Sequence, residues 1–337
     1  MPPLECDVLI AAFDVSNVAR THGPLKQHTM SRPNILLGAA LAGAAGIGFA
    51  ANSTAAKIAY GGGTNPLTFL TLRSILAMLL VLTIIVLART SLHLPLRRRL
   101  AALTIGALLA VYSYGLLSAI QFIPVALAVL IFYTFPLLTN VYAWVSGQER
   151  PTLRSVGALI VAFFGLALAL DLQGGQLNVL GVGLATMAAI GITVVVILNN
   201  RVVGNGDSRP VTFHMMLSAA IVFAVVTGVL GDYALPSTGG AWAAFLIGPS
   251  IYAIAIVTVF IAISLAGPST AAMSMNLEPV ASMTFGFLIL GQALSAMQLF
   301  GAALVILAVL SLRLSDTRIP AAKDAAFNQT SDPEKTP

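Results

Sequence analysis

One carboxylic acid, Glu278, lies within a long apolar stretch of this sequence. Of the twelve aspartates and glutamates, four fall in predicted loops and seven in the two tails, so Glu278 is the exception. A carboxyl group in such surroundings is costly and is usually functional, which makes Glu278 a candidate for carrying protons. Two structural alternatives stay open: Glu278 could be the fixed partner of a buried base, or it could cap the backbone opened by Pro279.

Tyrosine and asparagine side chains in other apolar stretches are candidates for binding a small molecule. Tyrosine combines an apolar ring with a polar tip, which suits a pocket for an amphipathic solute. The predicted solute-binding residues, chosen by their depth and polarity, are Asn52, Tyr112, Tyr133, Asn140 and Asn276. Glu278 completes this set as the predicted coupling residue.

Two prolines are predicted to act as hinges. Pro136 and Pro279 lie deep inside apolar stretches, where each removes a backbone hydrogen bond and kinks its helix. In transporters, broken helices expose carbonyl groups that can coordinate a solute. Because proline is also ordinary in membrane helices, a purely structural role is the alternative.

No residue spacing here is typical of an enzyme or a cofactor site. The single cysteine, Cys6, excludes a disulfide framework and a cysteine-ligated metal. The sequence contains no nucleotide-binding loop, no metal-ligand spacing and no Ser/His/Asp constellation. One buried acid without a matched base is a poor catalytic set. We therefore predict no catalytic residue, no metal site and no cofactor.

The composition predicts an all-α protein that spans a membrane several times. Charged residues make up 9% of the 337 residues and hydrophobic residues 58%, whereas about a quarter of a soluble domain is charged. The apolar runs are about 20 residues long, as expected for membrane-spanning helices. Ten spans are predicted, at roughly 35–57, 66–88, 100–120, 124–146, 153–171, 177–200, 210–230, 242–265, 268–290 and 296–313.

The two ends of the sequence are polar. Residues 1–34 are predicted to form a disordered cytoplasmic tail, and residues 314–337 a second one. Translation could start at Met1 or at Met30, which lies just ahead of the first span. With the amino terminus inside the cell, fifteen of the seventeen lysines and arginines face the cytoplasm, with Lys57 outside and Arg73 within a span. This distribution follows the positive-inside rule, which explains the net charge of +5 without a nucleic-acid partner.

The chain contains an internal repeat of about 144 residues. Pro124 and Pro268 lie 144 residues apart, as do Gly157 and Gly301. We expect a first five-helix repeat at 35–172 and a second at 173–313. Because five is an odd number of spans, the second repeat would be inverted in the membrane, an arrangement that suits alternating access.

Three segments resemble the ten-helix drug/metabolite transporter superfamily of the EamA type. They are Pro124–Pro136 with the two leucines that follow it, the hinge Gly147–Arg154, and Pro66–Arg73. The second hinge departs from the pattern, with Gln292-Ala293 where a glutamate is common. The resemblance covers about residues 33–313. It implies a bacterial inner-membrane carrier whose cavity is lined by spans one, three, four, six, eight and nine.

The resemblance also affects how Arg73 is interpreted. This arginine could pair with Glu278, hold a solute carboxylate, or extend its guanidinium to the outer lipid headgroups. In the usual arrangement of the family, the spans that hold Arg73 and Glu278 are not neighbours. We therefore expect Arg73 to reach the headgroups or to have a local structural role.

Inversion, one buried acid and the resemblance together predict a secondary transporter. The expected activity is export of amino acids or related small metabolites by alternating access, with possible coupling to protons through Glu278. The alternative is a non-transporting membrane scaffold or sensor with the same fold. The expected partners are a small-molecule solute and membrane lipids, in a monomer or a homodimer.

Overall fold

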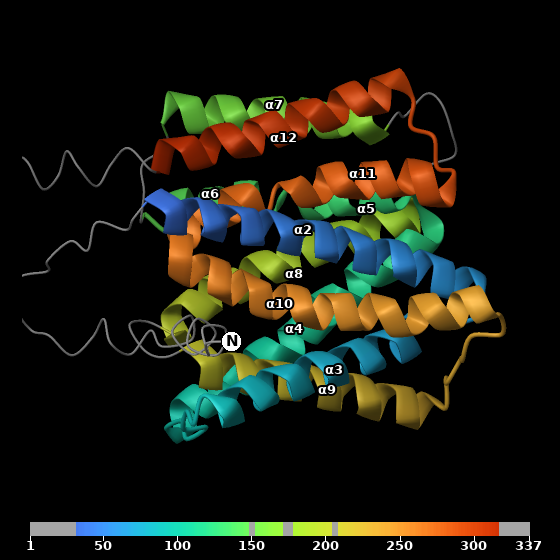
Figure 1. Ribbon diagram of the computed structural model, residues 1–337. Coiled ribbons are helices and arrows are strands. Elements are labelled where there is room, and N and C mark those ends of the chain that lie inside the picture. Colours follow the sequence, from blue (N-terminus) through green and yellow to red (C-terminus); the bar gives the residue numbers. More distant parts are fainter. Residues whose placement is uncertain (1–31, 148–151, 171–177, 204–207, 317–337) are drawn as a thin grey trace, which may run out of the picture.

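The computed structural model describes residues 32–147, 152–170, 178–203 and 208–316. Within these ranges all regular structure is helical (Figure 1). The helices run roughly parallel to one another across the view in Figure 1. Most of the two predicted tails lies outside the described residues.

Most helices follow the predicted spans. Their bounds are α2 (Arg32–Gly61), α3 (Pro66–Leu87), α4 (Leu96–Phe122), α5 (Val125–Phe132), α6 (Phe135–Val145), α7 (Leu153–Leu170), α8 (Val179–Val203), α9 (Ser208–Leu230), α10 (Gly239–Ser274), α11 (Leu277–Leu290) and α12 (Ala296–Asp316). However, α10 continues through the boundary predicted between the eighth and ninth spans, with one non-helical residue there, Gly267 (φ 79°).

The described residues contain eight segments that are long and apolar enough to cross a membrane. Two of them, Val125–Val145 and Thr270–Leu290, each combine two helical pieces separated by a break. Shorter apolar helices, Val156–Ala169 and Ala296–Ser311, lie where the fifth and tenth spans are predicted. The chain is therefore a multi-pass membrane protein, and ten spans remains a prediction.

The beginning of α3 shows how local sequence sets a helix boundary. Asn65 caps the helix: its side-chain oxygen accepts a hydrogen bond of 2.8 Å from the backbone N–H of Thr68. Pro66 follows at the first helical position, where its missing N–H costs nothing. Gly63, with φ of 101°, makes the turn that precedes the cap. This boundary forms one rim of a cavity described below.

The packing of the helices is the same when the two halves of the chain are exchanged. α4 packs against α8 and α9, and correspondingly α10 packs against α2 and α3. α5 and α6 lie against α8 as α11 lies against α2. α3 contacts its counterpart α9, and α7 contacts its counterpart α12 (Figure 1). The repeat seen in the sequence is thus also a repeat of contacts.

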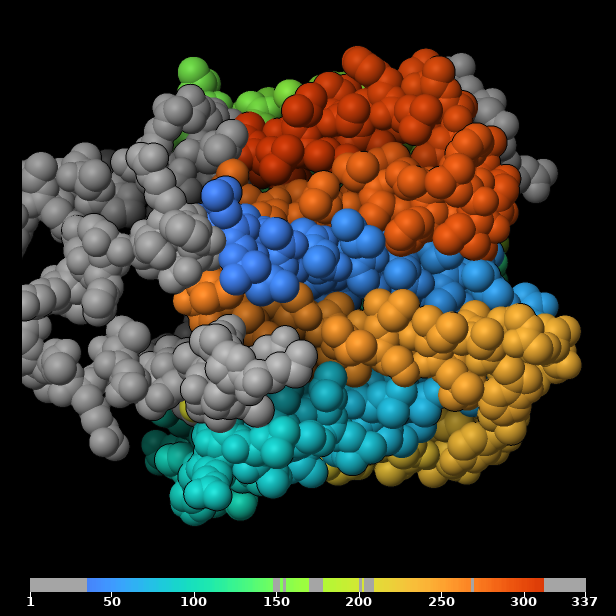
Figure 2. Space-filling view, in the orientation of Figure 1, coloured from blue at the N-terminus to red at the C-terminus, as the bar shows by residue number. Residues whose placement is uncertain are grey.

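The small residues of α2 serve packing within the chain. In the space-filling view α2 lies between α10 and α11 (Figure 2). A Cβ atom on Gly46 would lie 2.9 Å from the carbonyl oxygen of Met275, and one on Gly38 would lie 2.6 Å from the Cβ of Ala266. Glycine at these positions allows close approach of the helices.

Gly157 and Gly301 test the packing of α12 against α7. They are equivalent in the repeat, but a Cβ on Gly301 would collide with backbone atoms of Gly165 and Ala169, whereas one on Gly157 would meet nothing within 4 Å. We expect Gly301→Ala to lower the free energy of unfolding by about 1–3 kcal/mol, because α12 must move away from α7. Gly157→Ala is the matched control and should be neutral or slightly stabilising. Thermal melts in detergent measure both, and equal melting temperatures would contradict this packing.

Candidate functional site

Two spans are broken at equivalent places, just before the predicted hinge prolines. α5 ends at Phe132 and α6 begins at Phe135, while α10 ends at Ser274 and α11 begins at Leu277. A proline has no N–H, and its ring clashes with the carbonyl group four residues earlier. For Pro136 that carbonyl belongs to Phe132, and for Pro279 it belongs to Met275. The breaks therefore follow from the two prolines, and hinge motion at them stays a prediction.

The break in the second repeat binds a side chain from the break in the first. Pro279 has no N–H that could donate to the Met275 carbonyl oxygen. This oxygen instead accepts a hydrogen bond of 3.0 Å from the backbone N–H of Glu278. It also lies 3.0 Å from the hydroxyl oxygen of Tyr133. Tyr133 lies between α5 and α6, so its side chain joins the two broken spans.

Glu278 is buried at the same junction. It lies in the first turn of α11 and is 5% exposed. Its Oε2 atom is 2.8 Å from the Tyr133 hydroxyl oxygen, and Tyr133 is equally buried. A carboxylate is favoured at the amino end of a helix, where backbone N–H groups are unpaired. The structure therefore brings the predicted coupling residue together with one predicted solute-binding residue.

The remaining predicted residues lie at different distances from this junction. Asn276 precedes α11 directly, and its amide donates to the carbonyl groups of Ala272 and Met273. Tyr112 stacks on Phe132, the neighbour of Tyr133, with ring centroids 6.0 Å apart.

Asn52 and Asn140 are placed differently from one another. Asn52 is 2% exposed in α2, and within the described residues its side-chain oxygen has no hydrogen-bond partner. Asn140 donates to the carbonyl of Pro136 in its own helix, a bond of 2.8 Å. That bond gives Asn140 a local role within α6, and its predicted part in binding a solute stays a prediction.

Arg73 does not reach the lipid headgroups, so of the two expected roles only the local structural one stays open. Its side chain is 4% exposed, because α3 turns it toward the interior, where it meets Tyr252 of α10. The guanidinium carbon lies 4.1 Å from the centroid of the Tyr252 ring, a cation–π contact. Sequence reasoning could not find this, since α3 is apolar on all its faces and its pattern does not distinguish lipid from protein.

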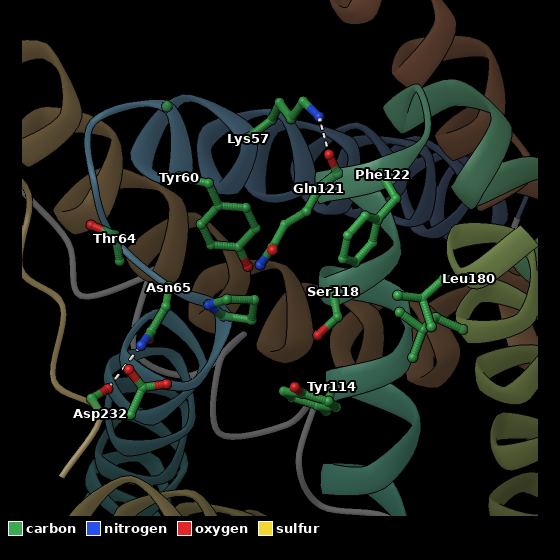
Figure 3. A pocket seen from close by; sticks show the side chains of 13 residues that line it. Lys57, Tyr60, Thr64, Asn65, Tyr114, Ser118, Gln121, Phe122, Leu180 and Asp232 are labelled. Atoms are coloured by element: carbon green, nitrogen blue, oxygen red, sulfur yellow. Dashed lines mark hydrogen bonds between the residues drawn. The ribbon is translucent and has the colours of Figure 1, made fainter. Parts of the chain in front are cut away.

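A cavity of about 690 Å³ opens at the junction of α2, α3, α4 and α8 (Figure 3). Lys57 in its wall donates to the carbonyl groups of Ile120 and Gln121 at the end of α4. At the rim the amide of Asn65 donates to the backbone carbonyl of Asp232, at 2.8 Å. The cavity also contains hydroxyl groups of Tyr60, Thr64 and Ser118.

Sequence reasoning missed this cavity. The hydroxyl oxygens of Tyr60, Thr64 and Ser118 are buried and, among the described residues, have no hydrogen-bond partner. The only signal in the sequence was Lys57, a cation at the end of an apolar run. No group of three or more His, Cys, Asp or Glu that could hold a metal lies in the described part of the chain.

Comparison with known proteins places this arrangement in a family. A crystal structure described only as "Crystal structure of protein" matches with a TM-score of 0.58 and 20% identity, over 86% of this chain and 99% of that chain. This likeness shows the fold alone. No curated protein matches the sequence. The model of the EamA-like transporter family matches twice, at residues 36–170 and again at 179–314. Two matches that together span most of the chain establish that this protein belongs to the EamA-like transporter family.

Proposed function

We propose that this protein is a secondary active transporter that exports amino acids or related small metabolites by alternating access. The observation that carries the proposal is the buried contact of Tyr133 with Met275 and Glu278, which links the broken span of one repeat to that of the other. Membership of the EamA-like transporter family supports transport. The reciprocal packing of the two repeats supports a movement in which they exchange roles.

The proposed orientation places both termini in the cytoplasm, in a bacterial inner membrane with ten spans and inverted repeats. Exposed arginines support it, because Arg89 follows α3 and Arg97, Arg98 and Arg99 begin α4 at one end of the bundle. The cavity with Lys57 and Asp232 is at the opposite end, which would face outward.

The Tyr133 contact supports coupling to protons. A phenol has a single hydrogen, so Tyr133 donates either to the Met275 carbonyl or to Glu278. When it donates to the carbonyl, the 2.8 Å contact with Glu278 is a hydrogen bond only if the carboxyl group is protonated and donates. When Glu278 is ionised, the phenol donates to it and the carbonyl loses that bond. One proton would thus change how the two helix breaks are joined.

Glu278→Gln tests this coupling because the amide always donates, as the protonated acid does. We expect the variant to lose accumulation driven by a pH gradient, by about tenfold or more, and to retain exchange of solute across the membrane. The measurement is uptake and counterflow of a pooled, labelled amino-acid mixture in proteoliposomes with and without a pH gradient. Tyr133→Phe should also weaken the gradient-driven flux, whereas Tyr233→Phe, an exposed tyrosine, is the matched control.

Two results would count against these ideas. Equal gradient-driven flux in wild type and Glu278→Gln would leave transport intact and make Glu278 structural. Absence of any flux of any metabolite in the wild type would favour the membrane scaffold or sensor.

Pro279→Ala tests whether the break in the second repeat is needed. The new N–H at position 279 could donate to the Met275 carbonyl and compete with Tyr133, closing the gap between α10 and α11. We expect the free energy of unfolding to rise by about 1 kcal/mol or more and transport to slow. Melting temperature and counterflow rate are measured together, with Pro95→Ala, at the exposed start of α4, as control. A more stable variant with undiminished transport would show that the break is dispensable.

A further inference from the structure

We propose that Arg73 binds a carboxylate group of the transported solute, which assigns the solute to the class of carboxylate-bearing metabolites. The inference rests on the proposed transport function and extends it to a chemical requirement. The observation behind it is a buried guanidinium that has an aromatic partner but, among the described residues, no acidic one.

The burial of Arg73 calls for an anion. The side chain is 4% exposed, and its Nε–H has no hydrogen-bond partner among the described residues. No ion pair to Glu278 or Asp232 is formed in the part of the chain that the structure describes. A charge and a donor buried without a partner are both costly, and an incoming anion would satisfy both.

The contact with Tyr252 leaves the binding edge of Arg73 available. The guanidinium carbon of Arg73 lies 4.1 Å from the centroid of the Tyr252 ring. Where a guanidinium stacks on an aromatic ring, its N–H donors lie in the plane of the group and stay available. An edge that presents two parallel N–H groups matches a carboxylate, which binds such a fork through both oxygens. Tyr252 would therefore fix the plane in which the solute is held.

The contacts along α2 place Arg73 between the outer cavity and the Tyr133–Glu278 junction. Tyr60 of α2 lines the cavity, whereas Phe49 of α2 contacts the Tyr252 ring that meets Arg73, with ring centroids 5.6 Å apart. A Cβ atom on Gly46 of α2 would lie 3.3 Å from the backbone nitrogen of Glu278. Arg73 also follows Pro66 by seven positions, about 10 Å along α3 from the rim of the cavity. A solute that enters the cavity would meet Arg73 before Glu278.

The other charges near the entrance are engaged or exposed. Lys57 donates to two backbone carbonyls, so its ammonium is already partnered. Asp232 is exposed at the rim. Thr64 and Ser118 also line the cavity, and their hydroxyl groups are buried without a partner among the described residues. A volume of about 690 Å³ is ample for a small metabolite.

The first test needs no variant. Wild-type proteoliposomes receive two labelled pools: one of amino acids and small carboxylic acids, the other of amino-acid amides, amines and polyols. We expect flux of the first pool, and we expect unlabelled amino acids to compete at least tenfold better than their amides. Flux confined to the second pool, or equal competition by amides, would overturn the inference and leave transport standing. Absence of flux from both pools would overturn the proposed function and this inference together.

The second test compares three variants of similar chemistry. Arg73→Gln should reduce flux about tenfold or more, and Arg73→Lys, which keeps the charge but not the fork, should retain part of it. Arg97→Gln, which removes an exposed arginine, is the matched control. Thermal shift with the first pool provides a binding readout, since carboxylates should raise the melting temperature of the wild type but not of Arg73→Gln. An equal shift in both proteins would contradict the assignment.

Discussion

The structure depends on the backbone carbonyl of Met275, which lacks its usual helical donor because position 279 is a proline. Within a bilayer every backbone polar group needs a partner inside the protein. Pro279 cannot donate to the Met275 carbonyl, so the chain supplies other donors: the N–H of Glu278 and the hydroxyl of Tyr133. The Tyr133 hydroxyl comes from the first repeat, whereas Met275 lies in the second. A missing hydrogen bond therefore fixes how the two broken spans meet.

The same constraint explains why the acid lies where it does. Glu278 follows the break directly, so its backbone N–H satisfies the Met275 carbonyl while its side chain faces Tyr133. Moving the acid by two residues along α11 would turn it about 200° around the helix, away from the tyrosine. The break before α11, the Glu278 backbone N–H that donates to Met275 and the Glu278 carboxyl group that faces Tyr133 therefore depend on one another. The first repeat has the break but has Phe135 at the place of the acid, so the site is asymmetric although the packing around it is repeated.

The sequence predicted the architecture better than the site. Apolar runs between turn residues are a strong signal, and the predicted span 66–88 became α3, Pro66–Leu87. The repeat located both helix breaks because each proline has a local, obligatory effect. The direction of a side chain is a different matter, since membrane helices are apolar whether they face lipid or protein. The burial of Arg73 against Tyr252 and the bond of Asn140 within its own helix therefore could not be anticipated.

Arg73 can bind a solute and Glu278 can bind a proton because the two side chains form no ion pair with each other. Two such groups in direct contact would form a fixed pair, and separating that pair during a transport cycle would be costly. Because Arg73 contacts Tyr252 and Glu278 contacts Tyr133, the arginine keeps an edge for an anion and the acid keeps a position for a proton. A bound carboxylate adds a negative charge near Arg73, and a bound proton removes the negative charge of Glu278, so in a low-dielectric interior each would favour the binding of the other. Coupling of this sign moves solute and proton in the same direction, so export would carry protons outward with the solute. Separation of the two residues therefore converts what would be a structural ion pair into a means of linking solute to proton.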